Sequence, residues 1–469
     1  MTAVSRSLFR VAILSFLITR PSLPKDYLDV LSLTEDQCKI AFPGLIDELH
    51  DAVLRGTFTF NKSNPDYKGL IQGRIKDGKL YILTSSPDTL PEILHQRTAI
   101  LQQLHRAIVT STTVIPDTHF AFVINDNPKD NSWSFAHPNK PNTDNTWLMP
   151  HFSFWSWPSP FLGTMDDALS RISHIESSTP FPSKIDKAVW RGTIWFNPIG
   201  NPYLRSKLIT TTTGKHWANI QKLEKDRDGE ITNSLNIEEF CKYKYVVYTE
   251  GVTYSGRLAY HQACESVLLM PPLTYLTHTA RWIKPVVAEE MMGTFGKTPG
   301  SDESEKVNKT TKGWSPPTIL PTVKDWREAN AVYVAKDWSD LESTIDFLRT
   351  HPKIAETIAS NQRKMTHGKG YLSSAAETCY WRALVKGWAS VAVPDGEWGD
   401  ELDKHILLEA WYILVFGHLS IVIDVETAVD CNNPVDFPPH FASAICILRL
   451  FTLIDLNYDI TSWIKRRQQ

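Results

Sequence analysis

The stretch from Tyr243 to Met270, "YKYVVYTEGVTYSGRLAYHQACESVLLM", constrains the fold more than any other part of the chain. A β-branched run, "YVVYT", breaks at a turn that contains Gly and Ser, "EGVTYSG". A short helical segment, "RLAYHQAC", follows and leads into a second apolar strand, "SVLLM". The order strand, turn, helix and strand predicts a βαβ unit, and hence two parallel strands in one sheet.

Other parts of the chain repeat this alternation of strands and helices. Apolar residues at helical spacing predict a helix from Pro87 to Val109, and "HFAFVI" predicts a buried strand from His119 to Ile124. Residues 331–365 predict a strand followed by two helices, with Ser339 as the N-cap of the first. We therefore expect an α/β protein with mainly parallel sheets, in which ligands bind beyond the carboxyl ends of the strands.

The turn inside the opening stretch has the composition of a phosphate-binding loop. Gly251 and Gly256 allow the backbone to come close to a ligand. The backbone N–H groups from Val252 to Arg257 can face that ligand, and the Arg257 guanidinium can bind a phosphate with two hydrogen bonds. Many turns between a strand and a helix contain Gly and Arg, so an ordinary connecting turn is the alternative.

The composition excludes some classes of function. A net charge of -3 argues against general nucleic-acid binding, which normally requires a basic surplus. The hydrophobic content of 42% and the charged content of 22% are those of an ordinary globular protein. Sixteen Trp residues can supply either flat faces for sugar binding or large side chains for the core.

The cysteines and the N-terminus bear on the compartment. Six cysteines lie far apart without a CxxC pair, which argues against a zinc site and permits long-range disulfides in an oxidising compartment. The N-terminus has basic Arg6 and Arg10 followed by an apolar run from Val11 to Thr19. This run fits a secretory signal or a weak membrane anchor, and equally a buried segment.

Several ordered blocks together resemble glycosyltransferase family 90. This family includes the fungal capsule-associated xylosyltransferases and the animal protein O-glucosyltransferases. The signature block is "CKYKYVVYTEGVTYSGRLAYHQACESVLL", and the supporting blocks come in the family's order over residues 33–390: "LTEDQC…FPGLIDEL", "FVINDNP", "PHFSFWSWP", "VWRGTIWFNP…NPYLRSKL", "DWSDLESTIDFLR" and "ETCYWRALVKGWA". The resemblance is strongest to fungal members.

The resemblance implies a GT-B-like fold, in which two Rossmann-like domains face each other across a cleft. The N-terminal domain, on the acceptor side, would span residues 33–165, and the C-terminal domain, which binds the UDP-sugar, residues 166–370. A helix at 371–394 would cross back to the first domain. Outside these parts lie an apolar leader at 1–32, an insertion rich in Gly, Pro, Ser, Thr and Lys at 293–321, and an apolar tail at 395–469 that matches nothing in the family.

The activity implied is transfer of a sugar, xylose or glucose, from a UDP-sugar to a hydroxyl of a glycan or protein with inversion. Asp126 in "INDNP" matches the family's catalytic base, although an aspartate there could also serve as an Asx-turn or helix cap. The matching donor-binding residues are Arg191, Gly192 and Thr193 in "WRGT", a second diphosphate-binding arginine at Arg205, and the loop of Val252, Thr253, Tyr254, Ser255, Gly256 and Arg257. For each arginine the alternative is a surface ion pair.

Cysteines and aromatic residues add to the resemblance. Cys241 with Cys264, and Cys38 with Cys379, match two disulfides of the family, which implies the lumen of the Golgi or endoplasmic reticulum. The N-terminus would provide any membrane association. The loop "PHFSFWSWPSP" offers Phe154, Trp155 and Trp157 as sugar or acceptor contacts, with packing in the core as the alternative.

No tightly bound metal or other cofactor is expected. The sequence "DRD", Asp226 to Asp228, resembles a metal-binding carboxylate pair, but it follows no apolar strand and is expected to be a solvated turn. Arginines would then stabilise the leaving UDP. Three rival hypotheses remain: a non-catalytic sugar- or nucleotide-binding protein of the same fold, a metal-dependent transferase that uses "DRD", and a nucleotide-sugar dehydrogenase or epimerase, which the missing GxGxxG motif disfavours.

Overall fold

The computed structural model describes residues 23–61, 67–87, 90–140, 146–159, 161–294 and 320–396, together with the backbone of residues 406–407. Residues up to Leu408 belong to one compact unit, whereas the second unit, Glu409–Gln469, lies outside the described residues. Residues 1–22 of the expected leader, residues 295–319 of the expected insertion and nearly all of the expected tail after residue 395 also lie outside them.

The sheet that contains the opening stretch, here called the second sheet, is parallel throughout. Its order is β13-β14-β11-β10-β8-β9. The expected strand, turn, helix and strand are confirmed, because β10 and β11 flank α6 and pair in parallel. The strands are β8 (Ile185–Gly192), β9 (Ala218–Lys222), β10 (Tyr243–Val247), β11 (Val267–Met270), β13 (Pro285–Val287) and β14 (Ala331–Tyr333).

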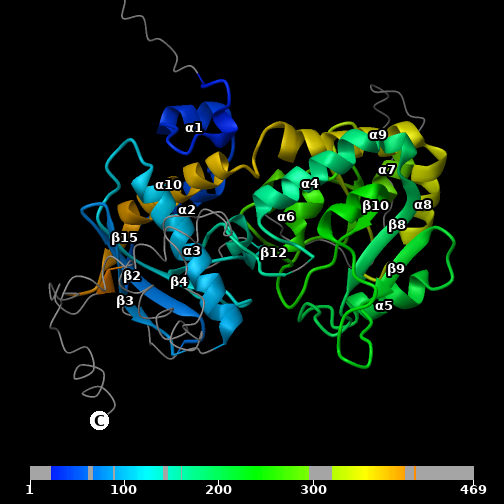
Figure 1. The fold of residues 1–469 in the computed structure, drawn as a ribbon. Helices are drawn as coiled ribbons and strands as arrows, with labels where there is room; N and C mark the ends of the chain where they lie inside the picture. Colours follow the sequence, from blue (N-terminus) through cyan, green and yellow to red (C-terminus); the bar gives the residue numbers. More distant parts are fainter. Residues whose placement is uncertain are drawn as a thin grey trace, which may run out of the picture. The chain divides into compact units, whose positions relative to one another are not determined.

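Helices pack around the second sheet (Figure 1). The helices that carry Leu208, Met291, Ile345 and Ile358 share one apolar core with the strands. Trp190, Trp217 and Trp338 are almost fully buried in it. For these three residues the core role of Trp is therefore confirmed. The helices are α4 (Met165–Ser178), α5 (Leu204–Thr212), α6 (Arg257–Gln262), α7 (Ala288–Thr294), α8 (Leu341–Thr350) and α9 (Pro352–Arg363).

The order of the second sheet reverses between β8 and β10. The chain leaves β8 through α5 and enters β9 on one side, whereas β10 lies on the opposite side of β8. In open α/β sheets, ligands bind outside the carboxyl ends of the strands at such a reversal. Gly192 ends β8, and the loop from Tyr248 to Gly256 follows β10. Both segments that resemble donor-binding motifs therefore lie at the reversal point.

The other sheet, here called the first sheet, has mixed strand directions in the order β16-β3-β2-β4-β5-β7. β4, β5 and β7 are parallel, but β2 is antiparallel to both β3 and β4. A tight turn at Asp77 and Gly78, both with positive φ, joins β2 to β3. Such a short turn can join only antiparallel strands, so this half of the sheet differs from the expected parallel arrangement. The strands are β2 (Leu70–Lys76), β3 (Lys79–Ser85), β4 (Thr118–Val123), β5 (Ser132–Ser134), β7 (Thr146–Leu148) and β16 (Ile406–Leu407).

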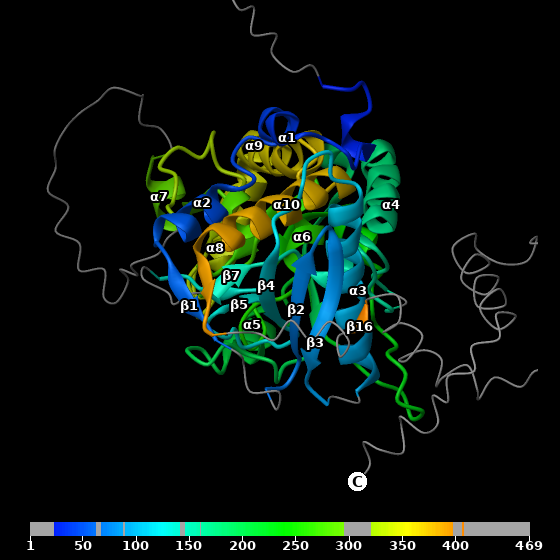
Figure 2. The same ribbon diagram turned by 90° about the vertical axis from the view of Figure 1, so that its left-hand side faces the viewer.

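After the second sheet the chain returns to the first through α10 (Ser374–Val391), which lies at the expected crossing helix. It packs against α2 (Asp47–Leu54) and α3 (Pro91–Val109). Its Trp388 packs edge-on against Trp133 of β5 and Trp147 of β7. β15 (Ala392–Pro394) then pairs with β1 (Phe58–Phe60), as Figure 2 shows. Elements from the N-terminal and C-terminal parts of the described chain therefore pack together beside the first sheet.

Segments that connect strands of the first sheet contact segments that connect strands of the second sheet at one junction. β6 (His137–Pro138) pairs with β12 (Tyr275–Leu276) in a two-stranded antiparallel sheet. Beside it, the backbone N–H of Asn139 donates to the carbonyl of Thr274, and buried Glu48 accepts hydrogen bonds from Arg281 and His137. Residues at the strand ends of both sheets can therefore contribute to one site.

One detail of the expected helix boundaries is wrong. The N-cap position of α8 is occupied by Asp340, not Ser339. The Ser339 hydroxyl donates to Asp337 instead, because Trp338 has positive φ and turns the chain before the helix begins. The remaining short elements are α1 (Glu35–Ala41), 3-10 helices at Tyr27–Asp29, Phe152–Phe154, Phe181–Ser183, Ile237–Lys242 and Ala280–Trp282, and a π-helical turn at Lys364–Gly368.

Candidate active site

The loop after β10 is held in a fixed shape by its own hydrogen bonds. The Tyr248 hydroxyl accepts from the backbone N–H of Ser255 (3.0 Å), and the N–H of Gly251 donates to the carbonyl of Tyr254 (3.0 Å). A Cβ at Gly251 would lie 2.8 Å from that carbonyl oxygen, so only glycine fits there without moving the loop. We call residues 252–257 the phosphate loop, after the role that the sequence predicts for them.

The phosphate loop lies directly against the segment that follows β7. A Cβ added at Gly256 would be 2.9 Å from His151 Nε2 and 2.9 Å from the Trp157 ring. Glycine at this position therefore permits close approach between the phosphate loop and the "PHFSFWSWP" segment.

Arg205 in α5 reaches the end of β10. Its Nε and Nη2 donate to the carbonyl of Glu250 at 3.1 and 2.8 Å, and its Nη1 donates to the carbonyl of Thr193 at 3.0 Å. Burial, and secondarily the positive charge of Arg257, lower the pKa of Arg205 to about 10. The side chain thus fastens the strand ends of β8 and β10 to each other.

Arg257, the first residue of α6, supplies a second positive charge nearby. Its Nη1 donates to the carbonyl of Arg191, and burial lowers its pKa. Within the described part of the chain, neither Arg257 nor Arg205 forms a salt bridge with an acidic residue. The surface ion pair that was the alternative for these arginines is therefore not what the structure contains. Two desolvated cations held close together by carbonyl oxygens favour a bound anion.

Arg191 lies differently from the other two arginines. Its guanidinium donates to the carbonyls of Trp190, Asn219 and Asn233 and to the Asn219 side chain. These contacts join β8 to the edge strand β9 and use most of its N–H groups. They favour a structural role for the Arg191 side chain. The next two residues form hydrogen bonds through their backbone carbonyls. The Gly192 carbonyl accepts from the N–H of Leu223, and the Thr193 carbonyl accepts from Arg205.

Asp126 follows β4 of the first sheet and contacts the phosphate loop. The Thr253 hydroxyl donates to the Asp126 backbone carbonyl at 2.6 Å. The Asx-turn that was the alternative for Asp126 is formed by its neighbour, because Asn125 Oδ1 accepts from the N–H of Asn127. The Asp126 carboxylate accepts no hydrogen bond from any described residue. Although it is open to solvent, the surrounding protein partly desolvates it, and this raises its pKa.

A pocket of about 370 Å³ lies between Asp126 and the phosphate loop. This volume falls within the range of small-molecule sites, roughly 300–1,000 Å³. Its walls combine aromatic and aliphatic side chains with nearly as many polar and charged ones. The lining residues are Lys68, Ile93, Gln96, Ile124, Asn125, Asp126, Phe135, His151, Phe152, Trp157, Tyr254 and Gly256.

The aromatic loop after β7 divides its side chains between this pocket and other surroundings. Trp157 lines the pocket, with its ring centroid 5.1 Å from that of His151. Phe154 is buried against His278 (5.3 Å), and the half-exposed Trp155 packs under the Arg106 guanidinium (5.1 Å). Among these three, the structure thus brings only Trp157 into the pocket, together with the neighbouring Phe152.

Tyr254 of the phosphate loop lines the same pocket as Asp126. Burial, and then the negative charge of Asp126, raise the pKa of the Tyr254 hydroxyl far above its ordinary value. The hydroxyl therefore keeps its proton and can donate a hydrogen bond into the pocket. Val252 and Ser255 complete the loop, and both are half-buried.

The pocket also contains polar residues that no sequence pattern singles out: Lys68, Gln96 and His151. Gln96 lies in the middle of α3, where polar residues on an amphipathic helix are expected to face solvent. His151 lies within a quoted block, yet a single histidine carries no spacing pattern. Only the three-dimensional arrangement of the segment before β2, α3 and the segment after β7 brings them together.

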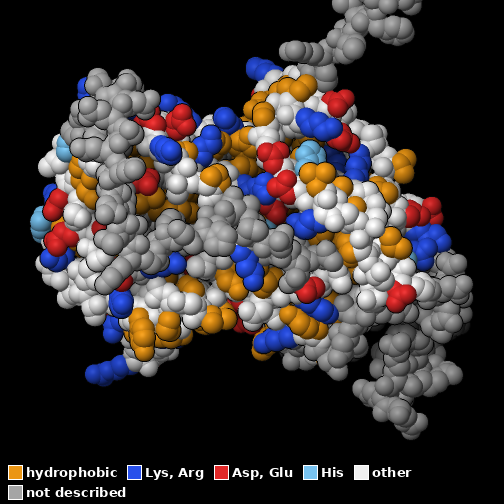
Figure 3. Space-filling view, turned by 180° about the vertical axis from the view of Figure 1, so that it is seen from behind, with side chains coloured by type: hydrophobic (Ala, Val, Ile, Leu, Met, Phe, Trp, Pro, Cys, Tyr) orange, Lys and Arg blue, Asp and Glu red, His pale blue; other side chains and the backbone are white. Residues whose placement is uncertain are grey.

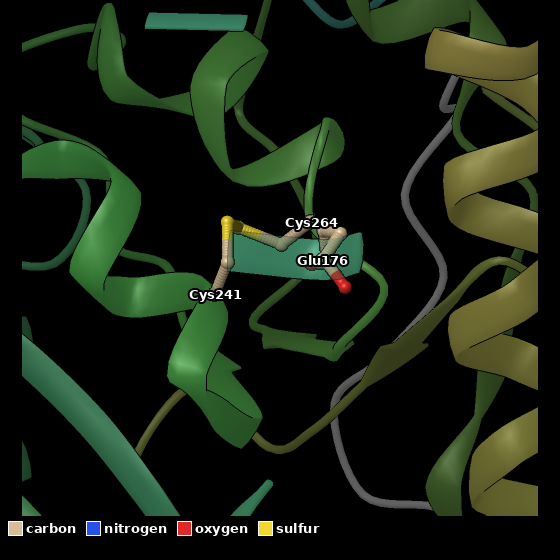
Figure 4. A group of neighbouring side chains, drawn as sticks. All are labelled: Glu176, Cys241 and Cys264. Atoms are coloured by element: carbon tan, nitrogen blue, oxygen red, sulfur yellow. A yellow bond between two sulfur atoms is a disulfide. The ribbon is translucent and has the colours of Figure 1, made fainter. Parts of the chain in front are cut away.

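Both disulfides implied by the resemblance are present, Cys38–Cys379 and Cys241–Cys264. Figure 4 shows Glu176 beside the second one. Disulfide sulfurs are not thiolate ligands for a metal, and the Glu176 carboxylate already accepts from Lys184 (2.8 Å) and from the N–H of Glu265 (2.7 Å). We therefore interpret this group as a structural contact. The two disulfides indicate folding in an oxidising compartment.

The "DRD" segment forms the exposed turn that was expected. Asp226 Oδ1 accepts from the N–H groups of Asp228 and Glu230 inside a loop closed by the bridge between Lys225 and Ile231. On the face drawn in Figure 3, positive and negative side chains are interspersed among hydrophobic ones. Among the described residues, no helix has the length and apolar character needed to cross a membrane.

A parallel sheet with two carbonyl-bound arginines and a tight loop at its reversal point is typical of proteins that bind phosphorylated ligands. Comparison with known proteins makes the class specific. Residues 62–288 match the family described as Glycosyl transferase family 90, and this part of the chain belongs to that enzyme family. The match includes Asp126, Arg205 and the phosphate loop. A search of curated proteins finds no match.

Proposed function

We propose that the protein is an inverting glycosyltransferase that moves a sugar, xylose or glucose, from a UDP-sugar to a hydroxyl of a glycan or protein. The observation that carries the proposal is the hydrogen bond from Thr253 to the Asp126 carbonyl, which joins the expected base to the expected phosphate loop across one pocket. The family match supports transfer of a sugar but leaves the donor, the acceptor and the residues open.

Asp126 is proposed as the general base. As the acceptor oxygen attacks the anomeric carbon, its proton passes to the Asp126 carboxylate, while the bond from that carbon to the phosphate oxygen breaks on the opposite face. The bonding electrons leave with UDP, so the sugar changes configuration at the anomeric carbon. A carboxylate without hydrogen-bond donors from the described residues, and with a raised pKa, is a better proton acceptor than an ordinary aspartate.

Arg257 and Arg205 are proposed to stabilise the UDP leaving group. Among the described residues, the Arg257 guanidinium donates one hydrogen bond, to the Arg191 carbonyl. Most of its N–H groups can therefore bind diphosphate oxygens. Arg205 adds positive charge and keeps β8 and β10 in place through Thr193 and Glu250. The phosphate loop would contribute backbone N–H groups, so the departing charge is stabilised by protein groups without a tightly bound metal.

The finer expectations from the resemblance belong to this proposal. They are the GT-B-like arrangement of two domains, with boundaries near residues 165 and 370, and a location in the Golgi or endoplasmic reticulum lumen. The two disulfides and the return of α10 to the first sheet support them. The alternative is a non-catalytic protein that binds a sugar or nucleotide in the same pocket.

The test is UDP release by the purified protein from UDP-xylose, UDP-glucose or UDP-galactose, with and without EDTA, beside Asp126→Asn. Slow donor hydrolysis does not require the acceptor to be known. EDTA-resistant release from one donor that is lost in Asp126→Asn supports the proposal. A protein that binds UDP but releases none from any donor favours the non-catalytic alternative, and release abolished by EDTA favours a metal-dependent transferase. A folded protein without affinity for UDP would overturn the assignment of the phosphate loop.

A further inference from the structure

His151 is a buried polar residue in the wall of the pocket. It precedes the 3-10 helix Phe152–Phe154, and only 9% of its surface is exposed. Its backbone carbonyl accepts from Gln103 in α3 (3.1 Å), and Gln103 in turn accepts from the Trp381 indole in α10 (3.0 Å). Two helices of the protein therefore fix the position of His151.

The hydrogen-bond network determines which ring nitrogen carries the proton. The N–H of Ser153 donates to His151 Nδ1 (3.2 Å), so Nδ1 is an acceptor and the hydrogen of the neutral ring is on Nε2. Burial, and then the nearby His278, lower the pKa of His151 to about 3. The ring is thus neutral at physiological pH, and Nε2 is a hydrogen-bond donor rather than part of a cation.

The Nε2 donor faces the phosphate loop. A Cβ at Gly256 would lie 2.9 Å from it, and the imidazole is surrounded by the rings of Phe135, Phe152, Trp157 and Tyr254. No described residue forms a hydrogen bond with Nε2. A buried donor that makes no hydrogen bond lowers the stability of the protein. At a pocket wall this cost is avoided when a ligand or a water molecule accepts the hydrogen bond.

We propose that His151 Nε2 donates a hydrogen bond to an oxygen of the transferred sugar and thereby contributes to recognition of the sugar in the UDP-sugar. This inference rests on the proposed function. The sugar is attached to the distal phosphate of UDP, so with the diphosphate on the phosphate loop the sugar begins beside Gly256, where Nε2 lies. The surrounding aromatic rings can pack against the C–H faces of a sugar, while Asp126 faces the acceptor hydroxyl.

The acceptor is a less suitable partner for His151. Nε2 adjoins the phosphate loop itself, whereas the acceptor has to approach the anomeric carbon from the face opposite the diphosphate. Direct recognition of the diphosphate by a protonated His151 also fits poorly, because a buried ring beside His278 resists protonation. Each possibility leads to a different experimental result.

The test compares binding of UDP with binding of UDP-xylose and UDP-glucose by isothermal titration calorimetry of the full chain. His151→Phe keeps a ring but removes the donor, His151→Gln keeps an N–H at a similar reach, and His174→Phe on the exposed face of α4 is the control. For His151→Phe we expect UDP affinity within about twofold of wild type and about tenfold weaker binding of the preferred UDP-sugar. His151→Gln should recover part of that loss, and the control should bind both ligands as wild type does.

Equal affinity of wild type and His151→Phe for the UDP-sugar would overturn the inference, as would an equal loss for UDP and UDP-sugar, which indicates damage to the phosphate loop. If the affinity of wild type for UDP falls as the pH rises from 5.5 to 8, a charged imidazole contacts the diphosphate. That result would also overturn the inference. If His151→Phe melts at a lower temperature than wild type, His151→Leu provides the same comparison without a ring at position 151. If the wild-type protein does not bind UDP, the proposed function itself is wrong. This result differs from those that overturn only the inference about His151.

Discussion

The Thr253 hydroxyl donates to the backbone carbonyl of Asp126 across 2.6 Å, and this bond links β4 of the first sheet to the phosphate loop of the second. Thr253 is fully buried, whereas the Asp126 carboxylate at the other side of its residue is open to the pocket. The proposed base is therefore positioned by the same loop that is proposed to hold UDP, so a change at Thr253 affects the geometry of Asp126 without touching its carboxylate.

The first prediction concerns this link. Thr253→Val preserves the shape of the side chain but removes the donor, and we expect kcat for donor hydrolysis to fall about tenfold, which corresponds to ~1.4 kcal/mol in the barrier. Thr253→Ser keeps the hydroxyl and should stay near wild type. Thr213→Val at the exposed end of α5 is the matched control. Steady-state kinetics and a melting curve for each variant separate loss of position from loss of fold; unchanged kcat in Thr253→Val would contradict the link.

The second prediction concerns pH. Partial burial raises the pKa of Asp126, and a general base acts only when it has lost its proton. As pH falls through that pKa, kcat/KM should decrease, and the midpoint should lie above the ordinary aspartate value of 3.8. The pH profile of UDP release measures it, with circular dichroism at each pH to confirm folding. A midpoint at or below the ordinary value would argue against Asp126 as the base.

Local patterns were sufficient to predict part of the second sheet. Short apolar runs next to helical segments predict β10, β11 and β14 close to their observed positions, because buried parallel strands and crossover helices each leave a strong pattern. The hairpin of β2 and β3 leaves a weaker signal. Its only local mark is the Asp77–Gly78 pair in a polar segment, and the prevailing alternation of strands and helices elsewhere in the chain favours parallel pairing over such a turn.

The candidate site was less predictable than the fold. The phosphate loop and the paired cysteines lie within recognisable blocks, but the direction of each side chain depends on packing. Arg191, Arg205 and Arg257 look alike in the sequence, yet Arg191 turns to Asn219 and Asn233 at the edge strand. His151 and Gln96 reach the pocket from segments far apart in the chain, and no local pattern can indicate that they meet.

The third prediction concerns Arg257. Arg257→Met removes the positive charge that has most N–H groups to spare, and we expect UDP affinity to fall at least tenfold, which is ~1.4 kcal/mol. Arg327→Met is the control, because Arg327 is exposed and its guanidinium contacts Asp325 and the Trp326 ring at the surface, far in sequence from the phosphate loop. Calorimetric titration with UDP, repeated at higher salt, measures the effect. If Arg257→Met binds UDP as tightly as the control, the proposed anion site is wrong.

The fourth prediction concerns the disulfides. Cys38–Cys379 closes a separation of 341 residues and Cys241–Cys264 one of 23. Because the constraint on the unfolded chain grows with loop length, Cys38→Ser with Cys379→Ser should lower the free energy of unfolding more than the corresponding Cys241 and Cys264 double variant, within the ~2–5 kcal/mol typical of native disulfides. Urea unfolding compares the two, and peptide mapping without reductant checks the pairing. A larger loss from the short loop would show that local packing dominates.

The fifth prediction concerns Glu250, which is buried behind the phosphate loop and accepts hydrogen bonds from the N–H and hydroxyl of Thr274 and from the N–H of Tyr275. Burial raises its pKa from 4.5 to about 7, so the folded protein holds a proton that the unfolded chain has already lost. Stability from this group is complete below pH 4.5 and is lost as pH rises to about 7, by on the order of 3 kcal/mol.

Glu250→Gln can keep all three contacts, because its oxygen accepts both N–H groups and its amide donates to the Thr274 hydroxyl, and it has no charge to bury. We therefore expect the free energy of unfolding of wild type, from urea curves at pH 5 and 7.5, to fall more steeply with pH than that of Glu250→Gln. Glu356→Gln on the exposed face of α9 should retain the wild-type slope. Equal slopes for wild type and Glu250→Gln would mean that Glu250 is ionised throughout this range and that its three hydrogen bonds outweigh the cost of burial.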